Sequence, residues 1–238
     1  MWHIIVYEKS TFDIIEVIEY LENNMKKIER IAILGSSIAL GHSSSEYGVG
    51  EYAKELFGVP LTKECVSGTT MSSKAPNSYI ERMIKNMDKN EHFDMFICQL
   101  STNDQWWGFE FGEIAKSCDL SDIDSTTITG AIEYIILYVK KTWNLYPVFF
   151  TSNRISGDIY KKMVDRLHEL EKKYPITVID LYSDDEFNNI SDEERSIYMA
   201  DSIHPTKEGY VKWWGPVMKK YYIEYFKRNG YEIPEGLE

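Results

Sequence analysis

A serine in a tight Gly-Ser-Ser turn is the first residue of this sequence that could do chemistry. Residues 31–41 read Ile-Ala-Ile-Leu-Gly-Ser-Ser-Ile-Ala-Leu-Gly, which predicts a buried strand that ends at Gly35-Ser36-Ser37. Such a strand would bring Ser37 to the carboxyl edge of a sheet, with its hydroxyl exposed as a nucleophile and its backbone N–H available to an oxyanion. Because serine and glycine are common in loops and helix caps, this motif alone is more often structural.

A candidate acid and base lie near the other end of the chain, in the segment Asp201-Ser-Ile-His204-Pro205. The Asp201 carboxylate can accept the imidazole Nδ1–H of His204 across one turn of loop, which leaves Nε2 free to take a proton from a serine. The alternative is a helix-capping aspartate beside an ordinary surface histidine. Among the other histidines only His42 competes, and we interpret it as exposed or pocket-lining because no acid lies nearby to orient it.

Two further segments could supply oxyanion donors, because each follows an expected strand. Gly68 lies in Val-Ser-Gly-Thr-Thr, and a glycine lets its backbone N–H approach a substrate oxygen closely. Asn103 lies in Leu-Ser-Thr-Asn-Asp, and its side-chain amide is a second possible donor. Each segment alone is equally typical of a turn.

The elements that must position these residues alternate along the chain. Runs rich in branched and aromatic residues predict strands buried on both faces, at Ile31–Leu34, near Thr62–Val66, and at Met95–Leu100, Val148–Thr151 and Ile176–Leu181. Apolar residues at three- and four-residue spacing predict helices over Tyr47–Phe57, Ser78–Met87, Thr127–Trp143, Asp158–Tyr174 and Lys207–Phe226. This alternation indicates an α/β fold, a three-layer α/β/α sandwich with a five-stranded parallel sheet. Ligands of such sheets bind beyond the carboxyl ends of the strands, where the strand order reverses.

The four segments, in this order, resemble the SGNH hydrolases, also called the GDSL esterase/lipase family. The resemblance spans nearly all of residues 30–215. It implies a catalytic triad and an oxyanion hole, in which Ser37 is the nucleophile, Asp201 and His204 are acid and base, and Ser37, Gly68 and Asn103 donate to the oxyanion. It also implies a flavodoxin-like strand order 2-1-3-4-5, which would place the ends of the first three strands side by side.

The sequence departs from the family pattern at two positions. Ser36 stands where the family usually has Asp, and Ser101 stands where it usually has Gly. Neither change removes a catalytic group. The first changes how the nucleophile turn is braced, and the second could narrow or redirect the loop that carries Asn103.

The resemblance implies a serine esterase that hydrolyses acyl esters, such as a carbohydrate O-deacetylase or small-ester esterase, through an acyl-enzyme intermediate. The expected partner is a small-molecule ester, an acylated sugar being one option. Trp106, Trp107 and Arg154 are the candidate substrate-binding residues, with a salt bridge as the alternative for Arg154. An acyl-thioesterase, a lysophospholipase or a non-catalytic binding module are the alternative functions. We expect no cofactor and no metal, since Asp201 and His204 lack further clustered ligands.

The composition limits the classes of partner and the cellular location that are expected. With 38 acidic and 26 basic residues the formal net charge is −12, which opposes binding to nucleic acid. No apolar run approaches the roughly 20 residues that cross a bilayer, so no membrane insertion is expected. The three cysteines, Cys65, Cys98 and Cys118, form no metal-binding pairs; they favour a cytoplasmic location, with the first two as buried thiols.

The length of 238 residues favours one domain, which we place at residues 25–238. Residues 1–24 form an N-terminal extension whose apolar positions Ile14, Ile15, Val17, Ile18 and Leu21 predict a possible helix. Either translation begins at Met25, or the extension packs on the sheet edge or on another subunit. The second alternative allows a homo-oligomer.

Overall fold

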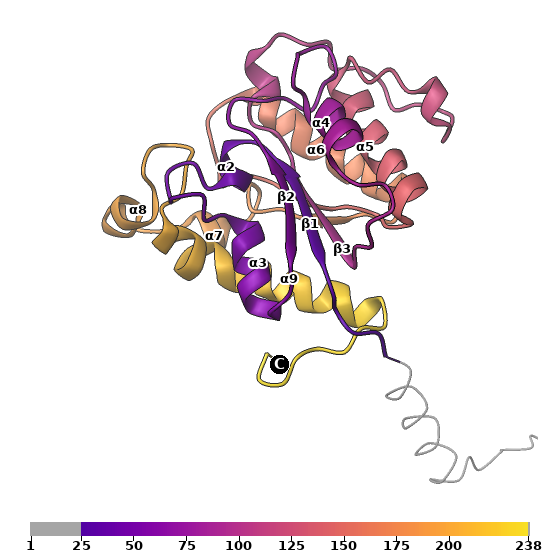
Figure 1. Cartoon of the computed structure of the whole chain (residues 1–238). Helices are drawn as coiled ribbons and strands as arrows, with labels where there is room; N and C mark the ends of the chain where they lie inside the picture. The colour runs from indigo at the N-terminus through magenta and orange to yellow at the C-terminus, as the bar shows by residue number, and fades with distance from the viewer. Residues whose placement is uncertain (1–24, 238) are drawn as a thin grey trace, which may run out of the picture.

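Five parallel strands form the centre of the computed structural model, which describes residues 25–237 (Figure 1). They lie in the order β2-β1-β3-β4-β5, and each neighbouring pair is parallel. The strands are β1 (Ile31–Gly35), β2 (Leu61–Cys65), β3 (Met95–Gln99), β4 (Val148–Phe150) and β5 (Thr177–Ile179). The expected α/β fold and strand order are confirmed. The predictions for residues 1–24 lie outside the described residues.

Helices cover both faces of this sheet and complete the three layers (Figure 1). On one face lie α4 (Tyr79–Asn86), α5 (Ile128–Trp143) and α6 (Asp158–Lys173), and on the other α3 (Val49–Phe57) and α9 (Gly215–Arg228). The shorter helices are α2 (Ser37–Leu40), α7 (Asp185–Asn188) and α8 (Asp192–Tyr198), with 3₁₀ turns η1 (Asp104–Trp106) and η2 (Leu120–Asp122) and a π-helix η3 (Gly209–Trp214). Within residues 25–237, no helix is long and apolar enough to cross a membrane.

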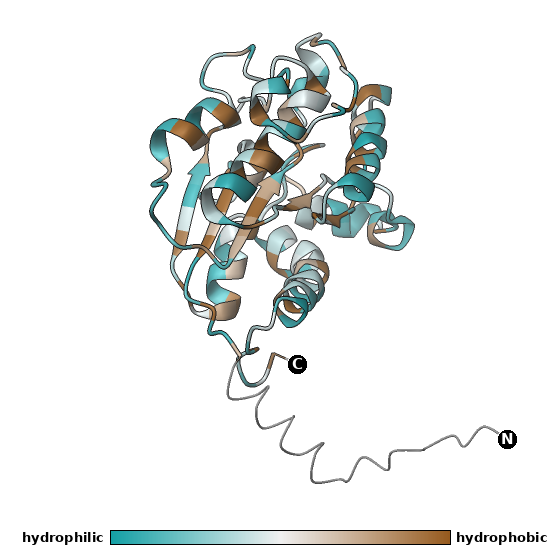
Figure 2. Ribbon diagram, turned by 90° about the vertical axis from the view of Figure 1, so that its right-hand side faces the viewer, coloured by the Kyte–Doolittle hydropathy of each residue, from teal (hydrophilic) through white to brown (hydrophobic). Residues whose placement is uncertain are grey.

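The central strands divide the interior into two cores, because successive side chains of a strand point to opposite faces. In β1, Ile31 and Ile33 pack toward α3 and α9, whereas Ala32 and Leu34 pack toward α4, α5 and α6. A strand buried on both faces must be apolar at every position, which is the pattern that made these segments recognisable in the sequence. Figure 2 shows the hydrophobic colour gathered in the middle of the fold.

Strand β2 departs from the expected burial on both faces. All five of its residues are only partly buried, including Lys63 and Glu64. The reason is its position, since β2 is an edge strand that pairs only with β1. Cys65 at its end is partly buried, whereas Cys98 in β3 is fully buried and Cys118 is exposed. Burial raises the pKa of the Cys98 thiol well above its ordinary value.

The helix expected over Lys207–Phe226 is confirmed as one continuous helical stretch, in which the π-helix η3 runs directly into α9. Pro216 stands in the first turn of α9, where its missing backbone N–H interrupts the α-helical hydrogen-bond pattern next to the π-helical turn. Trp213 and Trp214 are both buried and belong to the core between the sheet and α9. Trp213 stacks on Phe187 with 4.6 Å between ring centroids and donates its indole N–H to the carbonyl of Phe187 at 2.8 Å.

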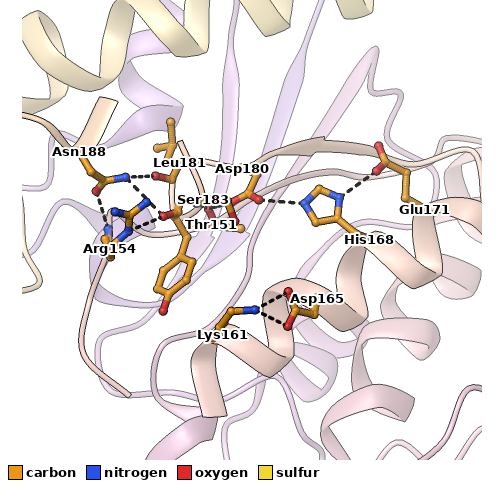
Figure 3. Close-up of polar contacts among 11 residues, drawn as sticks. Thr151, Arg154, Lys161, Asp165, His168, Glu171, Asp180, Leu181, Ser183 and Asn188 are labelled. Atoms are coloured by element: carbon orange, nitrogen blue, oxygen red, sulfur yellow. Dashed lines mark hydrogen bonds and ion pairs between the residues drawn. The ribbon is translucent and has the colours of Figure 1, made fainter. Parts of the chain in front are cut away.

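A polar cluster away from the predicted catalytic residues links α6 to the ends of β4 and β5 (Figure 3). His168 lies between two carboxylates, with Nε2 at 2.9 Å from Asp180 and Nδ1 at 3.1 Å from Glu171. Partial burial by itself would lower the pKa of His168, but its hydrogen bonds to the two carboxylates outweigh this, and the pKa is raised. Asp180 also accepts a hydrogen bond from the Thr151 hydroxyl at 3.2 Å.

We therefore predict that His168→Gln destabilises the fold in a pH-dependent way. A histidine whose pKa is raised on folding contributes stability that is fully present below its unfolded pKa and lost as pH rises through its folded pKa. The variant should lower Tm by about 1–3 °C near pH 6 and by less near pH 9, a size typical of partly exposed ion pairs. Lys161→Gln is the control, because it breaks the exposed Lys161–Asp165 pair on the same helix, whose lysine stays charged over this range. An equal loss at both pH values would contradict the prediction.

Candidate active site

The three residues predicted to form the triad meet at the carboxyl edge of the sheet. Ser37 begins α2 directly after β1, and its Oγ lies 2.8 Å from Nε2 of His204, which is 167 residues away in the sequence. The Nδ1 atom of His204 lies 2.8 Å from Oδ2 of Asp201. With a carboxylate on Nδ1, that nitrogen carries the ring hydrogen, so Nε2 can accept the proton of the serine.

Asp201 is held in place by its own loop. Its Oδ1 accepts the backbone N–H groups of Ile203 at 2.7 Å and His204 at 2.8 Å. Partial burial would raise the pKa of Asp201, but the hydrogen bonds from the His204 ring and from these two backbone groups hold the pKa below its usual range. The carboxylate is therefore ionised at neutral pH. A backbone hydrogen bond of 2.9 Å from Ala200 to His204 closes the same loop.

The turn that carries Ser37 is braced by Gln99 of the neighbouring strand β3, a residue for which the sequence motifs predicted no role. Its buried Oε1 accepts the backbone N–H groups of Ser36 at 3.0 Å and Ala39 at 2.9 Å. Tyr210 of η3 adds a hydrogen bond of 2.7 Å from its hydroxyl to the carbonyl of Ile38. The signal in the sequence was a single glutamine that ends the otherwise apolar strand Met-Phe-Ile-Cys-Gln.

The two segments expected to supply oxyanion donors lie beside Ser37. Gly68 has a positive φ of 77°, a conformation that favours glycine. Asn103 donates one hydrogen of its side-chain amide to the carbonyl of Thr69 at 2.8 Å, which fixes the amide and leaves its other hydrogen for a ligand. Within residues 25–237, no hydrogen bond uses the backbone N–H of Ser37 or of Gly68. The residues that carry these three donors line one cavity.

Ser101, which replaces the family's usual glycine, supports the loop that carries Asn103. Its buried hydroxyl oxygen accepts the backbone N–H of Asn103 at 3.1 Å. Asp104 anchors the same loop to its neighbour, because its carboxylate accepts the N–H groups of Met71 at 2.9 Å and Ser72 at 3.1 Å. Burial raises the pKa of Asp104, although these two hydrogen bonds oppose the rise.

A cavity of about 200 Å³ opens above these side chains. His42 is exposed and lines it, as expected, with Nδ1 at 3.3 Å from the Ser67 hydroxyl and its ring centroid 5.6 Å from that of His204. Asp201 lies behind His204 and does not line the cavity. The lining residues are Ser37, His42, Ser67, Gly68, Thr102, Asn103, Trp106, Ile203 and His204.

The three residues predicted to bind substrate have different surroundings. Trp106 lines the cavity and is 66% exposed, whereas Trp107 is 53% exposed and stacks on Phe109 at a centroid distance of 5.9 Å. Arg154 does not line the cavity: it forms an ion pair of 2.7 Å with Asp185, and its backbone N–H donates to Oδ1 of Asn188 at 2.8 Å. The salt-bridge alternative is therefore the one that the structure shows for Arg154.

No group of three or more His, Cys, Asp or Glu side chains in the described part of the chain is arranged to hold a metal ion.

Several solved structures share this fold. A candidate GDSL-like lipase from Bacteroides ovatus aligns over 86% of this chain and 100% of its own, with a TM-score of 0.58 and 18% identity. A candidate lipase from Chitinophaga pinensis aligns over 85% and 99%, with a TM-score of 0.59 and 14% identity. The chain has the fold of the GDSL-like lipases.

The GDSL-like fold also occurs in a family two carbohydrate esterase from Clostridium thermocellum, solved in complex with cellohexaose. This esterase aligns over 84% of the present chain and 66% of its own, with a TM-score of 0.53 and 14% identity. No family model and no curated protein matches the sequence. The solved structures confirm the fold that the sequence resemblance implied.

Proposed function

We propose that this protein is a serine esterase of the SGNH type, which hydrolyses short acyl esters through an acyl-enzyme. The observation that carries the proposal is the unbroken hydrogen-bonded chain from Ser37 Oγ through both ring nitrogens of His204 to Asp201. The proposal is also supported by proteins of the same fold that are described as a lipase and as a carbohydrate esterase.

In the first half of the reaction, Ser37 Oγ attacks the carbonyl carbon of the ester while His204 Nε2 takes the hydroxyl proton. The C–O double-bond electrons move to the carbonyl oxygen and return as the bond to the alcohol breaks, and His204 protonates the departing alcohol. Water then attacks the acyl-serine by the same steps, which releases the acid and restores Ser37. Asp201 stays ionised throughout and stabilises the imidazolium.

The oxyanion of each tetrahedral intermediate would receive hydrogen bonds from the backbone N–H groups of Ser37 and Gly68 and from the free amide hydrogen of Asn103. These donors are fixed before the substrate binds, because the strand ends and the Thr69 carbonyl hold them. Fixed dipoles need little reorganisation as negative charge develops, which is why such donors contribute strongly to turnover.

The cavity favours a short acyl group on a polar alcohol. Its volume of about 200 Å³ lies below the roughly 300–1,000 Å³ typical of sites that bury drug-sized ligands. Apart from Trp106 and Ile203, its lining consists of glycine and polar side chains, so a long alkyl chain would find little apolar surface. The exposed ring of Trp106 at the mouth suits stacking on a sugar ring. We therefore favour acetylated carbohydrates as substrates over lysophospholipids.

A panel of p-nitrophenyl esters of increasing acyl length, beside acetylated sugars and an acyl-thioester, tests this assignment. We expect the highest kcat/KM for the acetyl group, a steep fall with longer chains, and release of acetate from the sugars. A preference for long chains would instead favour a lysophospholipase, and a preference for the thioester would favour a thioesterase. Absence of turnover on all of them would contradict the proposed chemistry.

Asn103→Ala should lower kcat by about 10²–10³ with little change in KM, because its amide stabilises the oxyanion more than the ground-state carbonyl. The whole pH–rate profile should fall without moving along the pH axis, since Asn103 does not take part in proton transfer. Asn90→Ala, an exposed asparagine bonded only to Asp88, is the control and should keep the wild-type kcat. A wild-type kcat in Asn103→Ala would leave the oxyanion to the two backbone donors.

A further inference from the structure

A buried arginine of α4 lies behind the candidate active site and is not part of the proposed chemistry. Arg82 is only 3% exposed, and all five of its N–H donors are used. Nε donates to the carbonyl of Asn77 at 3.2 Å, and Nη1 donates to the carbonyl and to Oε1 of Glu64, both at 2.9 Å. Nη2 donates to the carbonyl of Gly35 at 2.9 Å and to the Thr69 hydroxyl at 3.0 Å.

Two of the residues that accept these hydrogen bonds belong to the ends of the strands that carry the candidate site. Gly35 is the last residue of β1 and precedes the nucleophile turn, while Glu64 belongs to the neighbouring β2. The Gly35 carbonyl also accepts the backbone N–H of Val66 at 3.2 Å. One guanidinium therefore links the end of the Ser37 strand with the segment that leads into Gly68.

Thr69 connects Arg82 to the two proposed oxyanion donors outside the Ser37 turn, the backbone N–H of Gly68 and the side-chain amide of Asn103. Its hydroxyl accepts from Arg82 and donates to the carbonyl of Val66 at 2.6 Å, which closes the turn that contains Gly68. Its carbonyl accepts the side-chain amide of Asn103 at 2.8 Å. Movement of Thr69 would therefore displace the N–H of Gly68 and the amide of Asn103 together.

A structural role alone does not account for this choice of residue. A buried charge is costly unless it is paired, and replacing such a pair by apolar side chains often leaves stability unchanged or improved. The paired cation here reaches four different residues at fixed angles, which requires the planar fork of an arginine rather than the single point charge of a lysine. The arginine is therefore required for the directions of its hydrogen bonds, not only for its charge.

We propose that Arg82, acting through the hydroxyl of Thr69, is a positioning residue that keeps the oxyanion donors of Gly68 and Asn103 in register with Ser37. The proposal rests on the function proposed above. It requires that loss of the Arg82–Thr69 hydrogen bond reduces stabilisation of the transition state and leaves substrate binding largely unchanged.

Three threonine variants provide the test. Thr69→Val keeps the shape of the side chain but removes the hydroxyl, and we expect kcat to fall by about 10- to 100-fold with KM within about twofold. Thr69→Ser restores the hydroxyl and should restore most of kcat. Thr129→Val is the matched control, because Thr129 is also buried, accepts an arginine N–H from Arg166 at 2.7 Å, and donates to a carbonyl, of Gly112, at 3.1 Å. Thr129 does not line the cavity and its variant should keep the wild-type kcat.

A double-mutant cycle separates positioning from general damage. If Thr69 acts partly through Asn103, then Thr69→Val should cost less in kcat when Asn103 is already Ala. Arg82→Lys, which keeps the charge, should show the same fall in kcat as Thr69→Val. Should that variant fail to fold, the threonine pair still decides the question.

A wild-type kcat in Thr69→Val, or a loss of equal size in Thr129→Val, would overturn the proposal while the esterase activity stands. Fully additive effects of Thr69→Val and Asn103→Ala would overturn the route through Asn103. Absence of hydrolysis in the wild-type protein, together with no labelling of Ser37 by a phosphonate, would overturn the proposed function and this inference with it.

Discussion

Ser37→Ala should abolish ester hydrolysis, with kcat lowered by about 10⁶-fold or below detection, because the substitution removes the proposed nucleophile. Folding should be almost unaffected, since only one cavity-lining hydroxyl is lost and the turn remains braced by Gln99. Steady-state kinetics and thermal unfolding of the same preparation give both quantities. Ser43→Ala, an exposed serine of the following loop, is the control and should retain full activity.

A serine-reactive phosphonate supplies the second measurement for Ser37. The reagent should label Ser37 once per chain, and peptide mass spectrometry should find no adduct on Ser36, which is fully buried with its backbone N–H held by Gln99. An adduct on another serine would show that the nucleophile has been assigned to the wrong residue.

Asp201→Asn should lower kcat by up to about 10⁴-fold while leaving the loop intact. The asparagine oxygen can still accept the N–H groups of Ile203 and His204, as Oδ1 of Asp201 does. Its amide, however, would donate to His204 Nδ1, which places the ring hydrogen on Nε2 and prevents that nitrogen from accepting the proton of Ser37. Asp185→Asn is the control, since that carboxylate pairs with Arg154 away from the cavity.

The pH dependence distinguishes this defect from the loss of an oxyanion donor. The pKa of Asp201 is held below its usual range, so the carboxylate stays ionised across the working pH range and is expected to stabilise an imidazolium at His204. Its replacement should therefore move the ascending limb of the kcat/KM profile to lower pH, because the cationic ring loses its partner. A profile that only falls in height would argue against an electrostatic contact between Asp201 and His204 in the working enzyme.

The fold and the residues of the candidate site could be predicted from the sequence because each is encoded locally. Strands such as Ile31–Gly35 and Met95–Gln99 are apolar at nearly every position, which only a strand buried on both faces requires. The nucleophile turn, the glycine and asparagine segments and the Asp201–His204 pair each follow or precede such an element. Parallel strands bring their carboxyl ends to one edge, so the order of these segments already implied a common site.

The sequence alone determined an α/β sandwich, its strand order through a family resemblance, and a short set of candidate residues at the sheet edge. Only the tertiary structure decided which polar residues support them: Gln99, Arg82, Thr69 and Tyr210 act through side chains and carbonyls that lie far apart in the chain. It also decided that Arg154 pairs with Asp185 and that β2 is a partly buried edge strand. The physical reason is that hydrophobic periodicity reports burial along one element, whereas a hydrogen bond between elements depends on how they pack.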